Sequence, residues 1–329
     1  MNILGMGNAL VDIMTQLKDD SILDRFKFPK GSMTLVDNEM SGYLYNETMG
    51  LIKHKTSGGS AANTIHGLSH LGVKTTFIGK IGNDELGKFF KKDMQNNGIN
   101  PILFNSITET GRVLAMVSPD SERTMATYLG AAIELCAQDL SSDIFKGQDF
   151  FYVEGYLVQN KELIQKSLRL AKQSGIKTCI DLASFNVVLE NIDFLKEIIS
   201  EYVDIVFANE EEAKALTGMA PEEALNILSG MCQIAVVKTG SKGSMVKEGS
   251  DIVVVPVRKA NSIDTTGAGD LYAAGFLYGK GNGYSNLISG EIGSLLGARV
   301  IEDIGAKMEE STWELLRREI KAIELKQTV

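Results

Sequence analysis

Short apolar runs alternate with helical patterns along most of this chain, and no other feature limits its possible folds as strongly. Runs typical of buried strands occur at 2–7, 74–79, 149–155, 176–181, 204–209 and 234–240. Helical patterns lie between many of them, at 61–72, 85–98, 161–175 and 192–203. Strands that alternate with helices form a parallel sheet covered on both faces. The sequence therefore predicts an α/β fold with a doubly wound, mostly parallel central sheet flanked by helices.

Two regions interrupt this alternation. Residues 10–36 and 102–129 have the pattern of short antiparallel strands joined by turns. We expect them to form a small antiparallel β-sheet beside the main body. A sheet over one edge of a site acts as a lid that keeps water from a reactive phosphate. We expect residues 1–329 to form a single domain that contains this lid.

Composition excludes several classes of function. The formal net charge is −9 and the pI is about 5.1, which argues against nucleic-acid binding because that activity leaves a basic surface. The three cysteines are widely spaced and indicate neither a disulfide framework nor a zinc site. No signal peptide and no apolar run of about 18 residues is evident. We therefore expect a cytoplasmic protein with no membrane partner.

The stretch DTTGAGD at 264–270 places small residues at the start of a helical pattern. The first backbone amides of a helix have no partners within the helix, and the helix dipole adds partial positive charge there. Such an end can hold an anion, and small residues let the anion approach closely. The carboxylate of Asp270 would then meet the chemical group that approaches the anion.

A second glycine cluster, SGGSAAN at 57–63, opens the next helical pattern. Two glycines let the backbone approach a ligand, and the Asn63 amide can bond a polyol hydroxyl. Taken alone, however, glycines before a helix are most often ordinary turn chemistry. His66 and His70 are spaced i, i+4, but Gly67 stands where a zinc protease has glutamate, which disfavours a metal site. The segment GMGN at 5–8 lacks the third glycine of a dinucleotide-binding turn.

Two polar segments follow predicted strands at the edge where open α/β sheets bind ligands. In NEEEAKALTG (209–218), Glu212 can hold magnesium-bound waters, because Mg²⁺ keeps several waters and takes few carboxylates. The alternative is a helix-capping pattern formed by Asn209 and Glu212. The glycine turn in VKTGSKGS (237–244) suits contact with a triphosphate or a ribose.

The segments DTTGAGDLYAAGFL (264–277) and SGGSAANTIHGLSHLG (57–72) resemble the two signatures of the ribokinase-like family, the PfkB-type carbohydrate and nucleoside kinases. Three further segments match family segments in the right order, at 77–90, 209–218 and 238–244. The resemblance thus covers essentially the whole chain. It implies the ribokinase-like fold and a phosphotransferase that acts on an alcohol group.

The resemblance also implies roles for individual residues. The catalytic base is Asp270, and the anion hole is formed by Gly267, Ala268 and Gly269. ATP is contacted by Asn209, Thr239, Gly240 and Gly243, and Mg²⁺ is held through water by Glu212. The acceptor is bound by Asp12, Gly58, Gly59, Asn63 and, from a lid strand, Arg123. ATP and Mg²⁺ are the expected cofactors. The sequence does not decide whether a monovalent cation also binds near Asp264.

Within the family, GMGNALVDI (5–13), GGSAANTI (58–65) and ERTMATYLGAA (122–132) look closest to adenosine kinases. Phe185 matches an aromatic residue that stacks on the base in a similar segment, and its alternative is a core phenylalanine. We expect ATP-dependent phosphorylation of a nucleoside, with adenosine as the favoured acceptor. The alternatives are a kinase of a free sugar (ribose, fructose or a keto-deoxy sugar acid) and a non-catalytic ligand-binding homologue. The oligomer is either a monomer or a homodimer paired through the lids.

Overall fold

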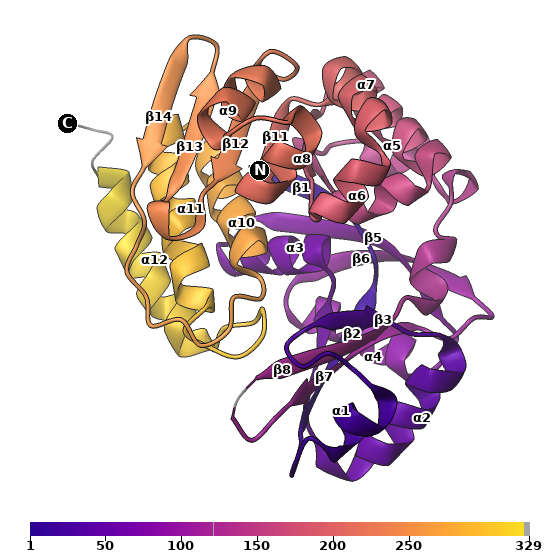
Figure 1. Cartoon of the computed structure of the whole chain (residues 1–329). Helices are drawn as coiled ribbons and strands as arrows, with labels where there is room; N and C mark the ends of the chain where they lie inside the picture. Colours follow the sequence, from indigo (N-terminus) through magenta and orange to yellow (C-terminus); the bar gives the residue numbers. More distant parts are fainter. Residues whose placement is uncertain (121, 326–329) are drawn as a thin grey trace.

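The computed structural model describes residues 1–120 and 122–325, which form two β-sheets with helices packed around them (Figure 1). The strands of the large sheet are β1 (Asn2–Met6), β5 (Lys74–Gly82), β6 (Ile99–Ser106), β9 (Phe150–Glu154), β10 (Lys177–Asp181), β11 (Ile205–Asn209), β12 (Ile234–Lys238), β13 (Ser244–Glu248) and β14 (Asp251–Val255). Their order is β14-β13-β12-β11-β10-β9-β1-β5-β6. Neighbours from β12 to β6 are parallel, and β12, β13 and β14 form antiparallel pairs. The predicted α/β class with a mostly parallel central sheet is confirmed.

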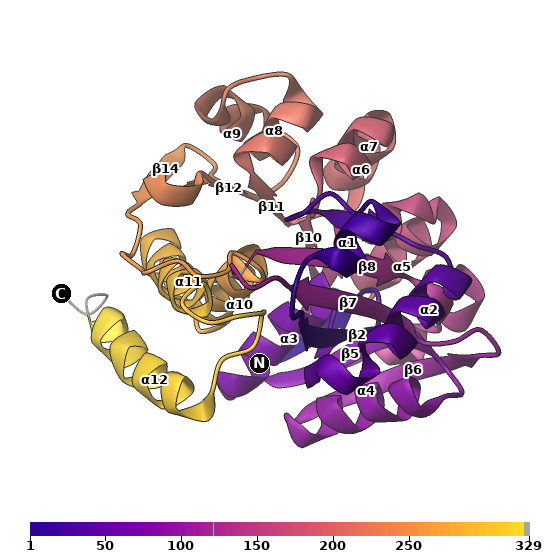
Figure 2. The same ribbon diagram turned by 60° about the horizontal axis from the view of Figure 1, so that its bottom comes forward.

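Helices cover both faces of this sheet, and Figure 2 shows the two layers on opposite sides of it. The helices on one face are α3 (Ser60–His70), α4 (Glu85–Asn96) and α10 (Ala268–Gly281). Those on the other are α5 (Lys161–Gln173), α7 (Ile192–Tyr202), α8 (Glu210–Thr217) and α9 (Pro221–Ser229). Because side chains alternate along a strand, Ile3 and Leu4 of β1 are both fully buried but belong to different cores. This double burial explains the continuous apolar runs of the sequence.

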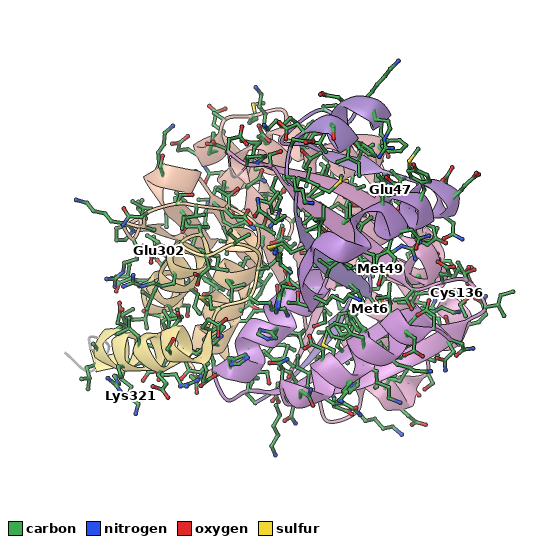
Figure 3. The ribbon with its side chains drawn as sticks, turned by 90° about the horizontal axis from the view of Figure 1, so that it is seen from below. Met6, Glu47, Met49, Cys136, Glu302 and Lys321 are labelled. Atoms are coloured by element: carbon green, nitrogen blue, oxygen red, sulfur yellow. The ribbon has the colours of Figure 1, made fainter. Side chains whose placement is uncertain are left out.

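The C-terminal helices α11 (Asn286–Val300) and α12 (Glu310–Glu324) build a third core against α10. Trp313 of α12 is fully buried there and packs with Leu271 of α10. Figure 3 shows α12, marked by Lys321, on the opposite side of the molecule from α2 (Asn38–Thr48), marked by Glu47. None of the helices in residues 1–120 and 122–325 has both the length and the hydropathy needed to cross a membrane.

The small sheet is the predicted lid sheet, with some different members. Its strands are β2 (Leu10–Gln16), β3 (Met33–Leu35), β4 (Ile52–Gly58), β7 (Gly111–Val117) and β8 (Arg123–Tyr128), in the order β3-β8-β7-β2-β4. The pair β7–β8 is antiparallel as predicted, β2–β4 is an antiparallel pair that was not predicted, and β2–β7 and β3–β8 are parallel. The remaining helices are α1 (Ser21–Phe26), α6 (Phe185–Glu190) and the short 3₁₀ turns Met49–Leu51, Gly130–Glu134, Ala137–Asp139, Ser142–Phe145, Gly155–Gln159 and Gly240–Lys242.

The boundaries predicted for the lid were wrong in three places. The run that begins at Ile102 belongs to β6 of the large sheet, because Ile102 and Leu103 pack into cores on opposite faces of that sheet. Residues 21–26 form the helix α1 rather than a strand. Strand β4 lies outside both predicted lid regions, because IKHKTSG carries only one large apolar residue, and an edge strand with polar neighbours lacks an alternating pattern.

Candidate active site

A cavity of about 1950 Å³ lies at the carboxyl ends of the parallel strands and is lined by residues of both sheets. The predicted site residues that line it are Asp12, Gly59, Asn63, Arg123, Asn209, Glu212, Gly240, Gly243, Ala268, Gly269 and Asp270. Four predicted residues do not line it: Gly58, Thr239, Phe185 and Gly267. Segments far apart in the sequence are thus brought together, as expected where parallel strands end at one edge of a sheet.

Asp270 lies in the first turn of α10, and two side chains from α3 fix its carboxylate. Ser60 donates its hydroxyl to Oδ1 over 2.7 Å, and Asn63 donates its amide to Oδ2 over 3.0 Å. Removal from solvent raises the pKa of Asp270 to about 6, although the bonds from Asn63 and Ser60 act in the opposite direction. At neutral pH the carboxylate is therefore ionised, yet it is a stronger base than an ordinary aspartate.

The start of α10 has the form of an anion site. Gly267 caps the helix with a φ of +78°, and a Cβ at this position would lie 2.6 Å from Cβ of Ala306. Glycine is required there, although it does not itself line the cavity. Ala268 and Gly269 do line the cavity, which brings the positively polarised end of the helix to its wall.

The two glycines before α3 make room for neighbouring groups, and Gly59 also lines the cavity. A Cβ at Gly58 would lie 2.3 Å from Oδ2 of Asp12, so this glycine makes room for the carboxylate on the neighbouring strand. A Cβ at Gly59, whose φ is +102°, would lie 2.1 Å from the backbone oxygen of Asn8. Burial raises the pKa of Asp12 to about 6, and the charges of Arg123 and Lys307 lower it.

The lid residue Arg123 pairs with the loop that precedes α10. Its guanidinium forms an ion pair with Asp264 and donates to Oγ1 of Thr266 over 2.6 Å. Asp264 also accepts from the backbone N–H groups of Thr266 (3.0 Å) and Gly305 (2.8 Å). Both carboxylate oxygens of Asp264 therefore have protein partners, and a monovalent cation near this residue stays a prediction.

Asn209 and Glu212 form a helix cap at the start of α8. The carboxylate of Glu212 accepts from the backbone and side-chain N–H groups of Asn209 over 2.8 and 2.7 Å, and Asn209 Oδ1 accepts from the Glu212 backbone over 2.8 Å. Burial, together with the charge of Asp181, raises the pKa of Glu212 to about 7. The helix-cap interpretation and the magnesium-binding interpretation of this segment are compatible, because the capping residues also line the cavity.

The glycine turn after β12 holds its shape through Thr239. The backbone N–H and hydroxyl of Thr239 donate to the oxygen of Gly243 over 2.8 and 3.0 Å. Gly240 and Gly243 have φ values of +53° and +95° and line the cavity. Thr239 thus stabilises the turn, while the two glycines are the members that can approach a nucleotide.

Phe185 is in neither of its predicted environments. Its side chain is 42% exposed at the start of α6, so it is not a core residue. Its neighbours Ser184 and Asn186 line the cavity, but Phe185 does not. Helix α6 begins at this residue, a boundary that the flanking sequence did not reveal.

Four charged residues in or near the site were missed by the sequence analysis. Glu154 ends β9; its Oε1 accepts from the backbone and side chain of Asn8 over 2.9 and 2.7 Å, and its Oε2 accepts from the backbone of Ala61 over 2.8 Å. Burial raises its pKa to about 7. The sequence feature that could have identified Glu154 is a carboxylate directly after the apolar run FFYV.

Lys238 and Asp181, which end β12 and β10, form an ion pair with an Nζ–Oδ2 distance of 2.8 Å.

Lys307 is the fourth missed residue. Its buried Nζ has no hydrogen-bond partner within residues 1–120 and 122–325. Burial lowers its pKa to about 8, although the carboxylates of Asp93 and Asp12 act to raise it. A buried donor without a partner costs about 1–3 kcal/mol, so this ammonium, which lines the cavity, is suited to a ligand atom. It lies in an irregular segment between α11 and α12, where no sequence pattern marks it.

The described part of the chain contains no cluster of three or more His, Cys, Asp or Glu side chains arranged to hold a metal ion. Glu212 is the predicted magnesium residue, and both of its oxygens already accept from Asn209. Their second lone pairs are suited to water rather than to direct coordination. The residues present therefore fit an ion that keeps its hydration shell.

Comparison with known proteins identifies a family and several similar structures. The model of the pfkB family of carbohydrate kinases matches residues 46–313. A probable sugar kinase from Rhizobium etli CFN 42 is 34% identical, with a TM-score of 0.86 over 97% of this chain and 98% of its own. An adenosine kinase from Sinorhizobium meliloti is also 34% identical, with a TM-score of 0.85 over 97% and 99%. The guanosine-inosine kinase of Escherichia coli K12 is 27% identical over 68% of this chain, and the match spans only 56% of that relative's length.

Proposed function

The chain belongs to the pfkB family of carbohydrate kinases, and from this premise we propose that it transfers the γ-phosphoryl group of ATP to a primary hydroxyl of a purine nucleoside, with adenosine as the first candidate. The position of Asp270 carries the proposal. It lies in the cavity at the first turn of α10, with its two oxygens fixed by Ser60 and Asn63. A general base so held removes the hydroxyl proton as the new bond to phosphorus forms, an effect of about 10²–10⁴-fold.

The phosphoryl end of the cavity supplies positive potential. The predicted anion-hole amides at 267–269 would bind the oxygens of the transferred group, although the N–H of Ala268 already donates to the carbonyl of Thr265 over 3.3 Å. Positioning and charge stabilisation do most of the work in phosphoryl transfer. Mg²⁺, held through water near Glu212, would neutralise charge between the β- and γ-phosphates. Gly240 and Gly243 let the nucleotide approach the turn after β12.

The acceptor end favours a nucleoside over a bare sugar. Asp12 and Asn63 offer polar atoms for the hydroxyls of a ribose. The same cavity continues along apolar side chains from Leu129, Ala132 and Leu157, which suit the flat face of a base. A monosaccharide would leave this apolar wall uncovered.

One observation favours a second candidate. The unpartnered ammonium of Lys307 lies near the carboxylate of Asp12, on the acceptor side. An ammonium in that position would bind the carboxylate of a keto-deoxy sugar acid. The acceptor is then smaller, and the apolar wall stays empty.

A panel of acceptors tests the proposal. We would follow ADP release with ATP and Mg²⁺ for adenosine, inosine, guanosine, ribose, fructose and a keto-deoxy sugar acid, with the Asp270→Asn variant as the control. The proposal predicts the largest kcat/KM for a purine nucleoside. A preference for the sugar acid would replace it with the second candidate, and no turnover with any acceptor would indicate a non-catalytic homologue.

A further inference from the structure

The ion pair between Lys238 and Asp181 lies at the phosphoryl end of the cavity. The two residues end β12 and β10, and Asn209 ends the strand between them. Both side chains line the cavity, with exposed fractions of 15% and 5%. The pair thus lies at the sheet edge where three of the predicted nucleotide contacts, Asn209, Gly240 and Gly243, line the cavity.

The ammonium of Lys238 also lies against the start of α10. A Cβ placed on Gly269 would be 3.1 Å from Nζ of Lys238. An ammonium and the positively polarised end of a helix repel each other unless an anion lies between or beside them. Although burial opposes it, the carboxylates of Asp181 and Glu212 hold the pKa of Lys238 above its ordinary value, so the charge persists at neutral pH.

Asp181 holds this ammonium in place with one oxygen. Its Oδ2 accepts from Nζ, and its Oδ1 accepts from the backbone N–H of Ala183 over 3.1 Å. Ala183 has a φ of +63°, so the second bond supports a turn that a residue with a Cβ seldom adopts. Among the described residues Asp181 is the one hydrogen-bond partner of Nζ, and an ammonium has three N–H groups, which leaves donors for a ligand.

We propose that Lys238 is a catalytic residue that binds an oxygen of the transferred γ-phosphoryl group, with Asp181 as its positioning residue. This inference rests on the proposed kinase function. In the step, the acceptor oxygen forms a bond to the γ-phosphorus, and the bond to the β–γ bridging oxygen breaks, with its electron pair leaving on ADP. The acceptor proton passes to Asp270. Lys238 stays protonated and balances negative charge on the phosphoryl oxygens beside the α10 amides.

A purely structural ion pair is the competing explanation, and paired variants separate the two. We would compare Lys238→Met, Asp181→Asn and the double variant, with the exposed Lys242→Met on the same turn as the matched control. Isothermal titration would give Kd values for ADP and for a non-hydrolysable ATP analogue at fixed Mg²⁺. Thermal unfolding would show whether each variant is folded.

For Lys238→Met we expect the ATP analogue to bind about 10–100-fold more weakly, with ADP changed by less than about threefold. We also expect kcat to fall by about 10²–10³-fold and the double variant to stay equally inactive. Lys242→Met should leave all values unchanged. Equal losses for ADP and the ATP analogue, or recovery of turnover in the double variant, would overturn the proposal.

The nucleotide titrations need no acceptor, so they separate this inference from the proposed function. A wild-type protein that binds the ATP analogue through Lys238 but phosphorylates no acceptor contradicts the proposed function alone. A protein that phosphorylates a nucleoside with kcat unaffected by Lys238→Met contradicts the role of Lys238 alone.

Discussion

Gly58 of β4 lies directly beside the carboxylate of Asp12 on the neighbouring strand, where a Cβ would come within 2.3 Å of Oδ2. Gly58→Ala should therefore displace Asp12, and a shift of about 1 Å costs on the order of 10²-fold in kcat/KM for the acceptor. Nucleotide affinity should not change. Steady-state kinetics with the acceptor varied, next to ATP titrations, measure both effects. Gly50→Ala, at a position with open space, is the control, and unchanged acceptor kinetics would refute the spacing argument.

Asp270→Asn should reduce kcat by about 10²–10⁴-fold while the protein stays folded. The pKa of Asp270 in the folded state, about 6, is above its ordinary value of 3.8, so its contribution to stability is lost as pH rises through 6. At pH 8 the variant should thus melt about 2–4 °C above wild type. The gap should narrow at pH 5 and close below about pH 4. Calorimetry at the two pH values checks the sign, and a variant that melts lower at pH 8 would contradict it.

The pH dependence of kcat/KM should have two limbs. Asp12 and Asp270, with pKa values of about 6, must be ionised, so the rate should rise with pH through that value. Lys307, with a pKa of about 8, loses its charge above that pH, so the rate should then fall. Lys307→Met should remove the alkaline limb and leave the acidic one. An alkaline limb that persists in this variant would assign it to another group.

Phe185→Ala should change the KM for a purine nucleoside by less than about threefold, because the side chain is 42% exposed and does not line the cavity. Base stacking on an aromatic side chain is worth about 1–3 kcal/mol, so a real stacking contact would raise KM by fivefold or more. Kinetics with adenosine distinguish these results. A large increase would restore the role that the sequence suggested for this residue.

The parts of the fold that the sequence predicted are those determined by local patterns. The strand that contains Ile3 and Leu4 is apolar on both faces, and the start of α10 is marked by consecutive small residues before Asp270. Neither feature needs knowledge of distant partners. The strand pairing of IKHKTSG does need it, because β4 forms only where β2 is available beside it.

The missed site residues depend on long-range assembly in the same way. Glu154 meets Asn8 and Ala61 from 146 and 93 positions away, and Lys238 meets Asp181 from 57 positions away. A single carboxylate or ammonium at the end of a strand has only a weak local signature, because most such groups are solvated. Their burial against each other is a property of the assembled sheet edge.

The link between Arg123 and Asp264 has a kinetic consequence. It joins strand β8, on the acceptor side, to the loop that leads into α10. An acceptor that draws the guanidinium toward itself must release Asp264, and the loop beside the phosphates then changes its hydrogen bonding. Acceptor occupancy would thereby alter how fast the nucleotide dissociates, so the two substrates would follow a preferred order of addition.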